Sequence, residues 1–148
     1  MNIKIQQINT EEAYPVRQVI LRPGRPAHTC CFDGDHDNNT FHFGAVDKNT
    51  LAGICSVYQK APPKQQGNHY WQIRGMAVLA EYQGQNIGTL LLNYCLDFIT
   101  QKAQQPIFWC NARIAAANLY KRQGFEIIGE QFEIPDVGPH YLMLKPAT

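Results

Sequence analysis

The residues from Gly75 to Gly88 have the types and the order that a phosphate-binding turn needs. An apolar Met-Ala-Val-Leu stretch runs into a turn with glycines at positions 84 and 88, and an amphipathic helical segment follows. Such a turn leaves successive backbone N–H groups pointing outward, and the helix behind it adds the positive end of its dipole. These donors predict a site for phosphate oxygens.

Two common nucleotide-binding loops do not fit these residues. A P-loop needs Lys and then Ser or Thr after its last glycine, whereas Gly88 is followed by Thr89 and Leu90. A dinucleotide-binding fingerprint needs G-x-G-x-x-G, and Gly84 and Gly88 are spaced differently. We therefore expect neither ATP chemistry nor a bound dinucleotide.

A second motif lies further along the chain. Residues 107–113 have the pattern of a buried strand, and the alanine-rich segment 114–123 favours a helix. Gly124 stands where a helix terminator is expected. A strand, a helix and its end are thus encoded in sequence.

Together the two motifs resemble the GCN5-related N-acetyltransferase (GNAT) family. Residues 83–88 are similar to its Q/R-x-x-G-x-G/A pyrophosphate loop, and residues 134–143 resemble the tail of small bacterial members. The family's A-x-x-x-Y-x-x-x-G-F signature is matched by Ala116, Tyr120, Gly124 and Phe125. One residue departs from the loop pattern, because Asn86 stands in place of the central glycine. Asparagine enters left-handed backbone conformations more readily than other residues with a Cβ, so we expect the loop to keep its shape.

The resemblance implies acetyl-CoA as cosubstrate and a set of residues that bind it. The end of the central strand would pair with the pantetheine arm through its backbone, the loop would hold the pyrophosphate, and two asparagines would contact the arm. These residues are Met76, Ala77, Val78, Gln83, Gly84, Gln85, Asn86, Ile87, Gly88, Thr89, Asn111 and Asn118. Lys121 and Arg122 are candidates for the 3′-phosphate of coenzyme A, or form a solvated helix end.

The thioester chemistry needs a neutral amine as nucleophile, a donor for the oxyanion and help for the departing thiolate. A bulged strand offers one free N–H group for the oxyanion. Tyr120 matches the family tyrosine at the sulfur. Its reference pKa of about 10 against about 8.5 for a thiol makes full proton transfer uphill by roughly 2 kcal/mol, so hydrogen bonding is the favoured role. The alternative is a core tyrosine with a satisfied hydroxyl group.

No general base is obvious in the sequence, and ordered water is one alternative. We select His140, because the rigid Gly138-Pro139 pair precedes it on a late strand that lines the acceptor side in the family. The other candidates are Glu81, Glu126, Glu133 and Asp136.

The segment 28–37 invites interpretation as a metal site and does not support it. Asp33, Asp35 and Asp37 have the spacing of an EF-hand start, but the loop lacks the glycine and the final glutamate. Cys30 and Cys31 are adjacent and lack the Cys-x-x-Cys spacing of zinc ligands. We expect a solvated acidic loop and no metal.

Composition sets broad limits. A chain of 148 residues with 45% hydrophobic residues predicts a single folded domain over residues 1–148. Thirteen basic and twelve acidic residues give a formal charge of +1, which argues against nucleic acid or membrane as partners. The five cysteines and the absence of a long apolar stretch lead us to expect reduced thiols and a cytoplasmic location.

The pattern of elements predicts an α/β fold, in the sense of an α+β mixed sheet. We expect strands over 3–8, 41–47, 51–59, 70–79, 107–113, 125–132 and 140–145, with a bulge at Gly75-Met76. Helices are expected over 11–21 with Thr10 as cap, from 87, and over 114–123. The order is β-α-β-β-β-α-β-α-β-β, and the resemblance implies that strands 4 and 5 splay apart.

The leading hypothesis is an N-acetyltransferase that moves an acetyl group from acetyl-CoA to a primary amine of an unidentified small molecule or peptide by direct attack. The alternative is an acyl-CoA-binding sensor or partner-binding protein of the same fold without turnover. A homodimer is retained as an expectation of assembly.

Overall fold

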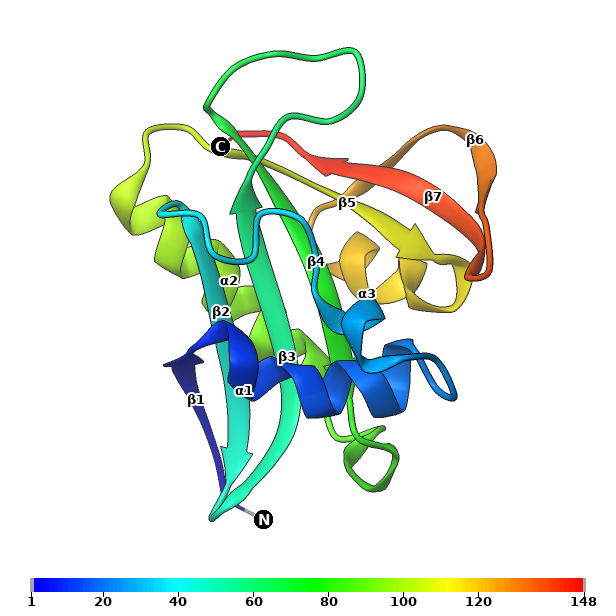
Figure 1. Ribbon diagram of the computed structural model, residues 1–148. Coiled ribbons are helices and arrows are strands. Elements are labelled where there is room, and N and C mark those ends of the chain that lie inside the picture. Colours follow the sequence, from blue (N-terminus) through cyan, green and yellow to red (C-terminus); the bar gives the residue numbers. More distant parts are fainter. Residues whose placement is uncertain (1, 148) are drawn as a thin grey trace. The chain divides into compact units, whose positions relative to one another are not determined.

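The computed structural model describes residues 2–147 and contains a mixed sheet with helices (Figure 1). The strands are β1 (Ile3–Ile8), β2 (Thr40–Asp47), β3 (Thr50–Gln59), β4 (Tyr70–Val78), β5 (Ile107–Arg113), β6 (Glu126–Ile134) and β7 (Gly138–Lys145). The α-helices are α1 (Thr10–Val16), α2 (Ile87–Lys102) and α3 (Ala117–Arg122). The predicted order of strands and helices is confirmed, and the hydrogen-bonded strand order is β1-β2-β3-β4-β5-β7-β6.

The parallel pairing of β4 with β5 is short. It covers three residue pairs, from Tyr70–Ile107 to Gln72–Trp109. Both strands continue past these pairs, to Val78 and Arg113 respectively. The pairing therefore ends where strands 4 and 5 are expected to separate.

The chain divides into two compact units. The first contains the residues up to Tyr58 together with Ile73–Phe98, and the second contains Gln59–Gln72 together with the residues from Ile99 onward. β3, β4 and α2 contribute residues to both units. The single domain over residues 1–148 stays a prediction.

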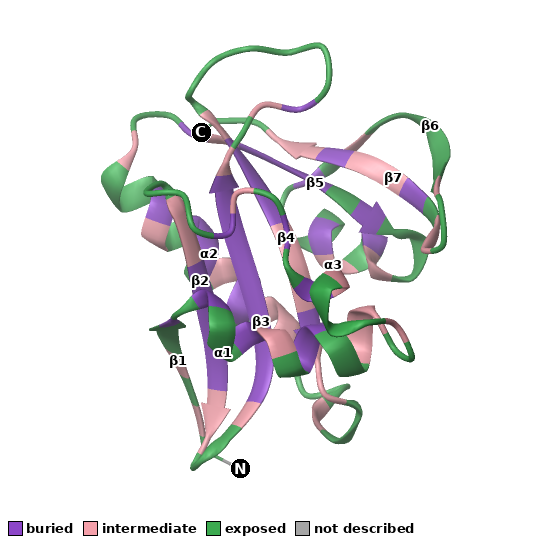
Figure 2. Cartoon of the chain, in the orientation of Figure 1, coloured by how far each residue is buried: buried purple, intermediate pink, exposed green. Residues whose placement is uncertain are grey.

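In the first unit, α1 and α2 lie on opposite faces of β2 and β3 (Figure 1), and buried residues follow these strands (Figure 2). On the α1 side, the buried cluster consists of Ile8, Ala13, Val16, Ile54 and Ala77. On the α2 side, the ring of Phe43 contacts the rings of Tyr94 and Phe98 at centroid distances of 5.2 and 5.0 Å. These two layers hold β2 and β3 between helices, which is why both strands are mostly buried.

The start and end of α1 differ from the prediction. Asn9, not Thr10, is the N-cap, because its side chain accepts from the Glu12 N–H while the Glu12 carboxylate accepts from the Asn9 N–H. This reciprocal capping box satisfies two donors at once. The α-helix ends at Val16, shortly after Pro15, and the chain continues as a wider π-helix over Arg17–Leu21. Pro15 lacks a backbone donor, which accounts for an irregular helix at this point.

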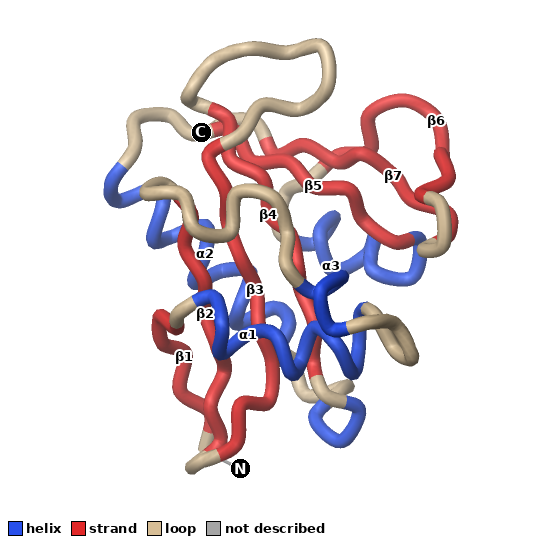
Figure 3. The backbone as a smooth tube through the Cα atoms, viewed as in Figure 1, coloured by secondary structure: helices blue, strands red, loops and turns tan. Residues whose placement is uncertain are grey.

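In the second unit, β7 pairs antiparallel with both β5 and β6 (Figure 3). The short helix α3 packs through Ala117 and Tyr120, both of which are buried. Gly124 adopts φ +94° and ends the helix, as the sequence predicts. β6 starts one residue later and ends two residues later than expected, β7 starts two residues earlier, and the register of their pairing shifts between Ile128 and Phe132.

Among residues 2–147 we find no helix whose length and hydropathy would allow it to cross a bilayer.

Candidate functional site

The loop between β4 and α2 has the backbone of an anion-binding turn. Gly84 adopts φ +79° and Asn86 adopts φ +64°, so Asn86 takes the left-handed conformation that the sequence predicts. The Leu90 N–H donates to the Asn86 carbonyl over 3.1 Å, which makes it the donor of the first helical hydrogen bond. The N–H groups of Ile87, Gly88 and Thr89 precede that bond, and such groups at a helix start are available to a ligand.

The loop is tied to the strand before it by side chains. Gln83 Nε2 donates to the Val78 carbonyl over 2.9 Å, and Tyr82 donates its hydroxyl to Asp47 Oδ2 over 2.9 Å. The Leu79 N–H also donates to the Ala52 carbonyl over 2.8 Å. The end of β4 and the loop are therefore positioned together, within the first unit.

The irregularity expected in β4 is present at Gly75, which adopts φ +72°. A Cβ there would lie 3.4 Å from Phe32 Cε2 and 3.6 Å from Arg17 Nε, which are ordinary contact distances, so the backbone conformation and not space requires glycine. Ala77 turns its side chain into the core, whereas Met76 and Val78 are half-buried. Because its side chain is buried, Ala77 can meet a ligand only through its backbone.

Tyr120 lies in the packed interior of the second unit. Its side chain is 5% exposed, and its ring meets that of Phe125 edge-on at 5.4 Å between centroids. This packing agrees with the core role that was the alternative for Tyr120. The catalytic role stays a prediction.

The two candidate asparagines, Asn111 on β5 and Asn118 on α3, are both exposed. Asn111 pairs with Leu142 in the β5–β7 ladder, so its backbone is fixed while its side chain is free to reach a ligand. Lys121 and Arg122 are exposed in the last turn of α3, so neither of their two interpretations is decided.

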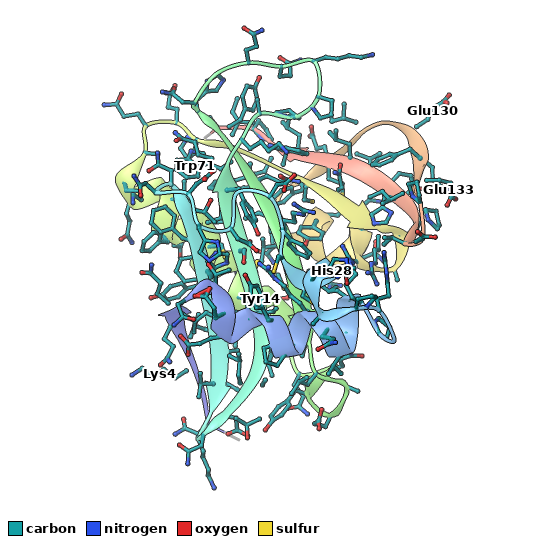
Figure 4. All side chains as sticks on the ribbon, viewed as in Figure 1. Lys4, Tyr14, His28, Trp71, Glu130 and Glu133 are labelled. Carbon is teal, nitrogen blue, oxygen red and sulfur yellow. The ribbon has the colours of Figure 1, made fainter. Side chains whose placement is uncertain are left out.

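His140 is buried on β7, and its tautomer follows from one contact. Its Nδ1 lies 2.7 Å from the Gly138 carbonyl oxygen. A carbonyl oxygen only accepts, so Nδ1 carries a proton, and in the neutral ring Nε2 is then the acceptor. The other base candidates, Glu81, Glu126, Glu133 and Asp136, are exposed, and Figure 4 shows Glu133 on β6 at the outside of the second unit.

The prediction of a solvated acidic loop is wrong for Asp35, because this residue is buried. Asp35 Oδ2 lies 2.7 Å from Arg17 Nη1, and both side chains are at most 2% exposed. The Tyr58 hydroxyl donates to Asp35 Oδ1 over 2.6 Å, and the Phe32 N–H donates to Oδ2 over 2.8 Å. Burial alone would raise the pKa of Asp35, but the hydrogen bonds from Arg17, Tyr58 and Phe32 outweigh it and lower that pKa.

A histidine extends this buried network. His42 Nδ1 lies 2.6 Å from Ser56 Oγ, and its Nε2 lies 2.9 Å from the Asp35 carbonyl. Burial lowers the pKa of His42, although Asp35 opposes the shift. Thr10, expected as a helix cap, instead donates its hydroxyl to the Asp35 carbonyl over 3.0 Å.

Sequence reasoning missed Arg17, which is fully buried. One signal was present: Arg17 stands four residues after Ala13 and directly after Val16, on the apolar stripe of α1. A charge on such a stripe needs a buried partner. In the part of the chain that the structure describes, no group of three or more His, Cys, Asp or Glu side chains is placed to hold a metal, and none of the five cysteines is in a disulfide.

Comparison with known proteins gives the family. Residues 4–125 match the model of the acetyltransferase (GNAT) family. The chain is 32% identical to the uncharacterized N-acetyltransferase YitI of Bacillus subtilis (strain 168) over 143 residues, covering 97% of this chain and 95% of that protein.

Solved structures show the same fold. A putative N-acetyltransferase from Lactobacillus plantarum matches with a TM-score of 0.78 at 17% identity, over 100% of both chains. The crystal structure of Arabidopsis thaliana NAA60 in complex with acetyl-CoA matches with a TM-score of 0.74 at 15% identity, over 98% of both chains. On the family match and the extent of the curated relative, this chain belongs to the GNAT family of acetyltransferases.

Proposed function

We propose that this chain transfers an acetyl group from acetyl-CoA to a primary amine of a small molecule or peptide. The observation that carries the proposal is the loop before α2, where Gly84 and Asn86 both have positive φ and the helix begins directly behind them. Family membership supports acetyl transfer, and the acetyl-CoA in the similar NAA60 structure supports the cosubstrate.

In this proposal the cosubstrate lies along the end of β4. The backbone groups of Met76, Ala77 and Val78 pair with pantetheine, and Asn111 and Asn118 contact the same arm. The loop residues Gln83, Gly84, Gln85, Asn86, Ile87, Gly88 and Thr89 hold the pyrophosphate. Donor-rich backbone suits this task, since the loop itself carries no cationic side chain.

The reaction joins the acceptor nitrogen to the thioester carbonyl and breaks the bond from carbon to sulfur. Positive φ at Gly75 turns the backbone at that point of β4, and the following Met76 N–H is our candidate donor for the oxyanion. The Tyr120 hydroxyl assists the departing thiolate by hydrogen bonding. Its burial favours this role energetically, because a hydrogen bond to a developing charge is stronger where water is excluded.

His140 is the proposed general base. With a proton on Nδ1 toward the Gly138 carbonyl, Nε2 of the neutral ring can accept the proton that the acceptor ammonium loses to become the attacking neutral amine. The four acidic candidates are exposed, so their carboxylates are solvated.

Two observations favour the alternative, an acyl-CoA-binding sensor without turnover. Asn86 replaces the central glycine of the loop, and the sequence shows no obvious general base. The backbone of Asn86 weakens the first, since a residue at φ +64° already has the conformation that glycine would supply. The deciding experiment is a screen of primary amines with acetyl-CoA that follows thiol release. Turnover with an amine supports the enzyme, whereas CoA binding without turnover across small amines and peptides supports the sensor.

A further inference from the structure

Three arginines surround one aromatic ring in the first unit. The guanidinium carbons of Arg17, Arg74 and Arg22 lie 4.1, 4.2 and 5.3 Å from the centroid of the Phe32 ring. Such stacking fixes the plane of a guanidinium while leaving its N–H edge open. Three like charges so close together are costly unless anions neutralise them.

The charge of Arg17 has a carboxylate partner. Asp35 binds the Nη1 and Nη2 atoms of Arg17 at 2.7 and 3.1 Å. Arg74 is half-buried, and we find no hydrogen bond or ion pair for its side chain among residues 2–147. The cluster therefore retains positive charge.

One buried donor of the cluster is also unsatisfied. Arg17 Nε is buried without a hydrogen-bond partner, although the side chain is fully enclosed. It lies 3.6 Å from the position that a Cβ on Gly75 would occupy, so it faces the irregular point of β4. Buried N–H groups are rarely left unpaired, and an unpaired one in a native structure calls for a missing partner.

The position of the cluster connects it to the reaction. Arg74 stands two residues before Met76, and two extended residues span at most about 7 Å. An arginine side chain here is therefore close to the strand segment where the thioester is proposed to lie. Tyr14, shown on α1 in Figure 4, adds a ring 5.8 Å from the Arg17 guanidinium carbon.

We propose that Arg74, supported by Arg17 and Arg22 around Phe32, recognises an oxyanion on the acceptor, so that the substrate is an amine that also bears a carboxylate or phosphate group. This inference rests on the proposed function, since it assigns the acceptor class of the same site. A planar guanidinium binds either oxyanion through two parallel N–H bonds.

The test compares matched acceptors on wild type, Arg74→Gln and Arg74→Glu. The probes are 5-aminopentanoate, 5-aminopentanamide, 1,5-diaminopentane, phosphoethanolamine and ethanolamine. We expect wild type to prefer the anionic member of each set, and Arg74→Gln to lower that preference by about 10- to 100-fold, as for a lost charged hydrogen bond. Arg74→Glu should reverse it in favour of the diamine. Activity with aminopentanoate or with phosphoethanolamine identifies which oxyanion is bound.

The matched control is Arg25→Gln, since Arg25 is in the same loop region and is not among the arginines around Phe32. It should keep the wild-type preference. CoA affinity should be the same in all variants. A preference unchanged by Arg74→Gln, or a loss of CoA affinity that accounts for the whole effect, would overturn the proposal.

A binding readout separates this proposal from the proposed function. Glutarate has two carboxylates and no amine, so it cannot be acetylated. We expect glutarate or inorganic phosphate to raise the Tm of the acetyl-CoA-loaded wild type and of Arg25→Gln, and to leave Arg74→Gln unshifted. Anion binding without turnover of any amine would contradict acetyl transfer alone, whereas equal shifts in all three proteins would contradict the oxyanion site alone.

Discussion

Gln83 Nε2 donates a 2.9 Å hydrogen bond to the carbonyl oxygen of Val78. This bond joins the last residue of β4, where pantetheine is proposed to pair, to the first residue of the loop that is proposed to hold the pyrophosphate. The pantetheine arm and the pyrophosphate of CoA would thus bind to two segments whose relative position is fixed by this hydrogen bond. Preorganisation of this kind lowers the entropy that binding must overcome.

Replacing Gln83 by Ala should weaken CoA binding by about 3- to 10-fold, the equivalent of one neutral hydrogen bond. Its exposure makes a folding defect small, because exposed substitutions have little effect on stability. Isothermal titration of CoA into both proteins measures the change. Gln101→Ala, an exposed glutamine on α2 outside the proposed CoA-binding residues, is the matched control, and the bond would be irrelevant if both variants bound CoA alike.

Asn86→Gly should keep or improve CoA affinity, since glycine adopts φ +64° without steric cost. Asn86→Val should cost about 1–2 kcal/mol of stability, because a β-branched residue resists the left-handed region. Thermal unfolding and CoA titration of both variants check this pair. Markedly weaker binding by Asn86→Gly would instead reveal a contact from the asparagine side chain.

Tyr120→Phe keeps the ring contact with Phe125 and deletes only the hydroxyl. If the hydroxyl assists the thiolate, turnover should fall by about 10- to 1000-fold while CoA affinity stays near wild type. Rate per folded molecule and Tm are measured on one preparation. A lower Tm with an unchanged rate would make Tyr120 a core residue and nothing more.

The buried histidine predicts how stability responds to acid. Because burial lowers the pKa of His42, the unfolded chain, with a pKa of about 6.5, binds the proton more readily. The stabilisation is complete above about pH 6.5 and is lost as pH falls through the lower folded pKa. Urea unfolding between about pH 7.5 and 5 should show this loss in wild type and a flatter profile in His42→Gln. His28→Gln, at an exposed site, should retain the wild-type slope; a wild-type stability that rises on acidification would refute the assignment.

The sequence predicts local structure well wherever one residue type decides the backbone. Asn86 in the left-handed region and the helix end at Gly124 are confirmed, because each depends on φ alone; the bulge at Gly75-Met76 stays a prediction, beside a positive φ at Gly75. The cap of α1 was misassigned to Thr10, since two adjacent residues could cap and only the reciprocal bond from Glu12 selects Asn9.

The rest depends on contacts between distant residues. Asp35 lies in a segment whose composition is typical of a solvated loop, and only its ion pair with Arg17 and its hydrogen bond from Tyr58 explain its burial. The cluster around Phe32 joins positions 17, 22 and 74, which no spacing rule links. Whether Tyr120 and His140 act on a substrate stays a prediction, since both side chains are buried and a buried position alone does not distinguish catalysis from packing.

The central claim is that CoA binds with its pyrophosphate on the loop before α2, and Gly88→Glu tests it most directly. A carboxylate in the first turn of α2 places a negative charge where the pyrophosphate is proposed to sit, while it remains compatible with the helix dipole. Isothermal titration of CoA and of 3′-dephospho-CoA into wild type and into the folded variant is the measurement. We predict that Gly88→Glu abolishes the binding of both ligands. Unchanged affinity in a variant with the wild-type Tm would contradict the assignment of this loop to the cosubstrate.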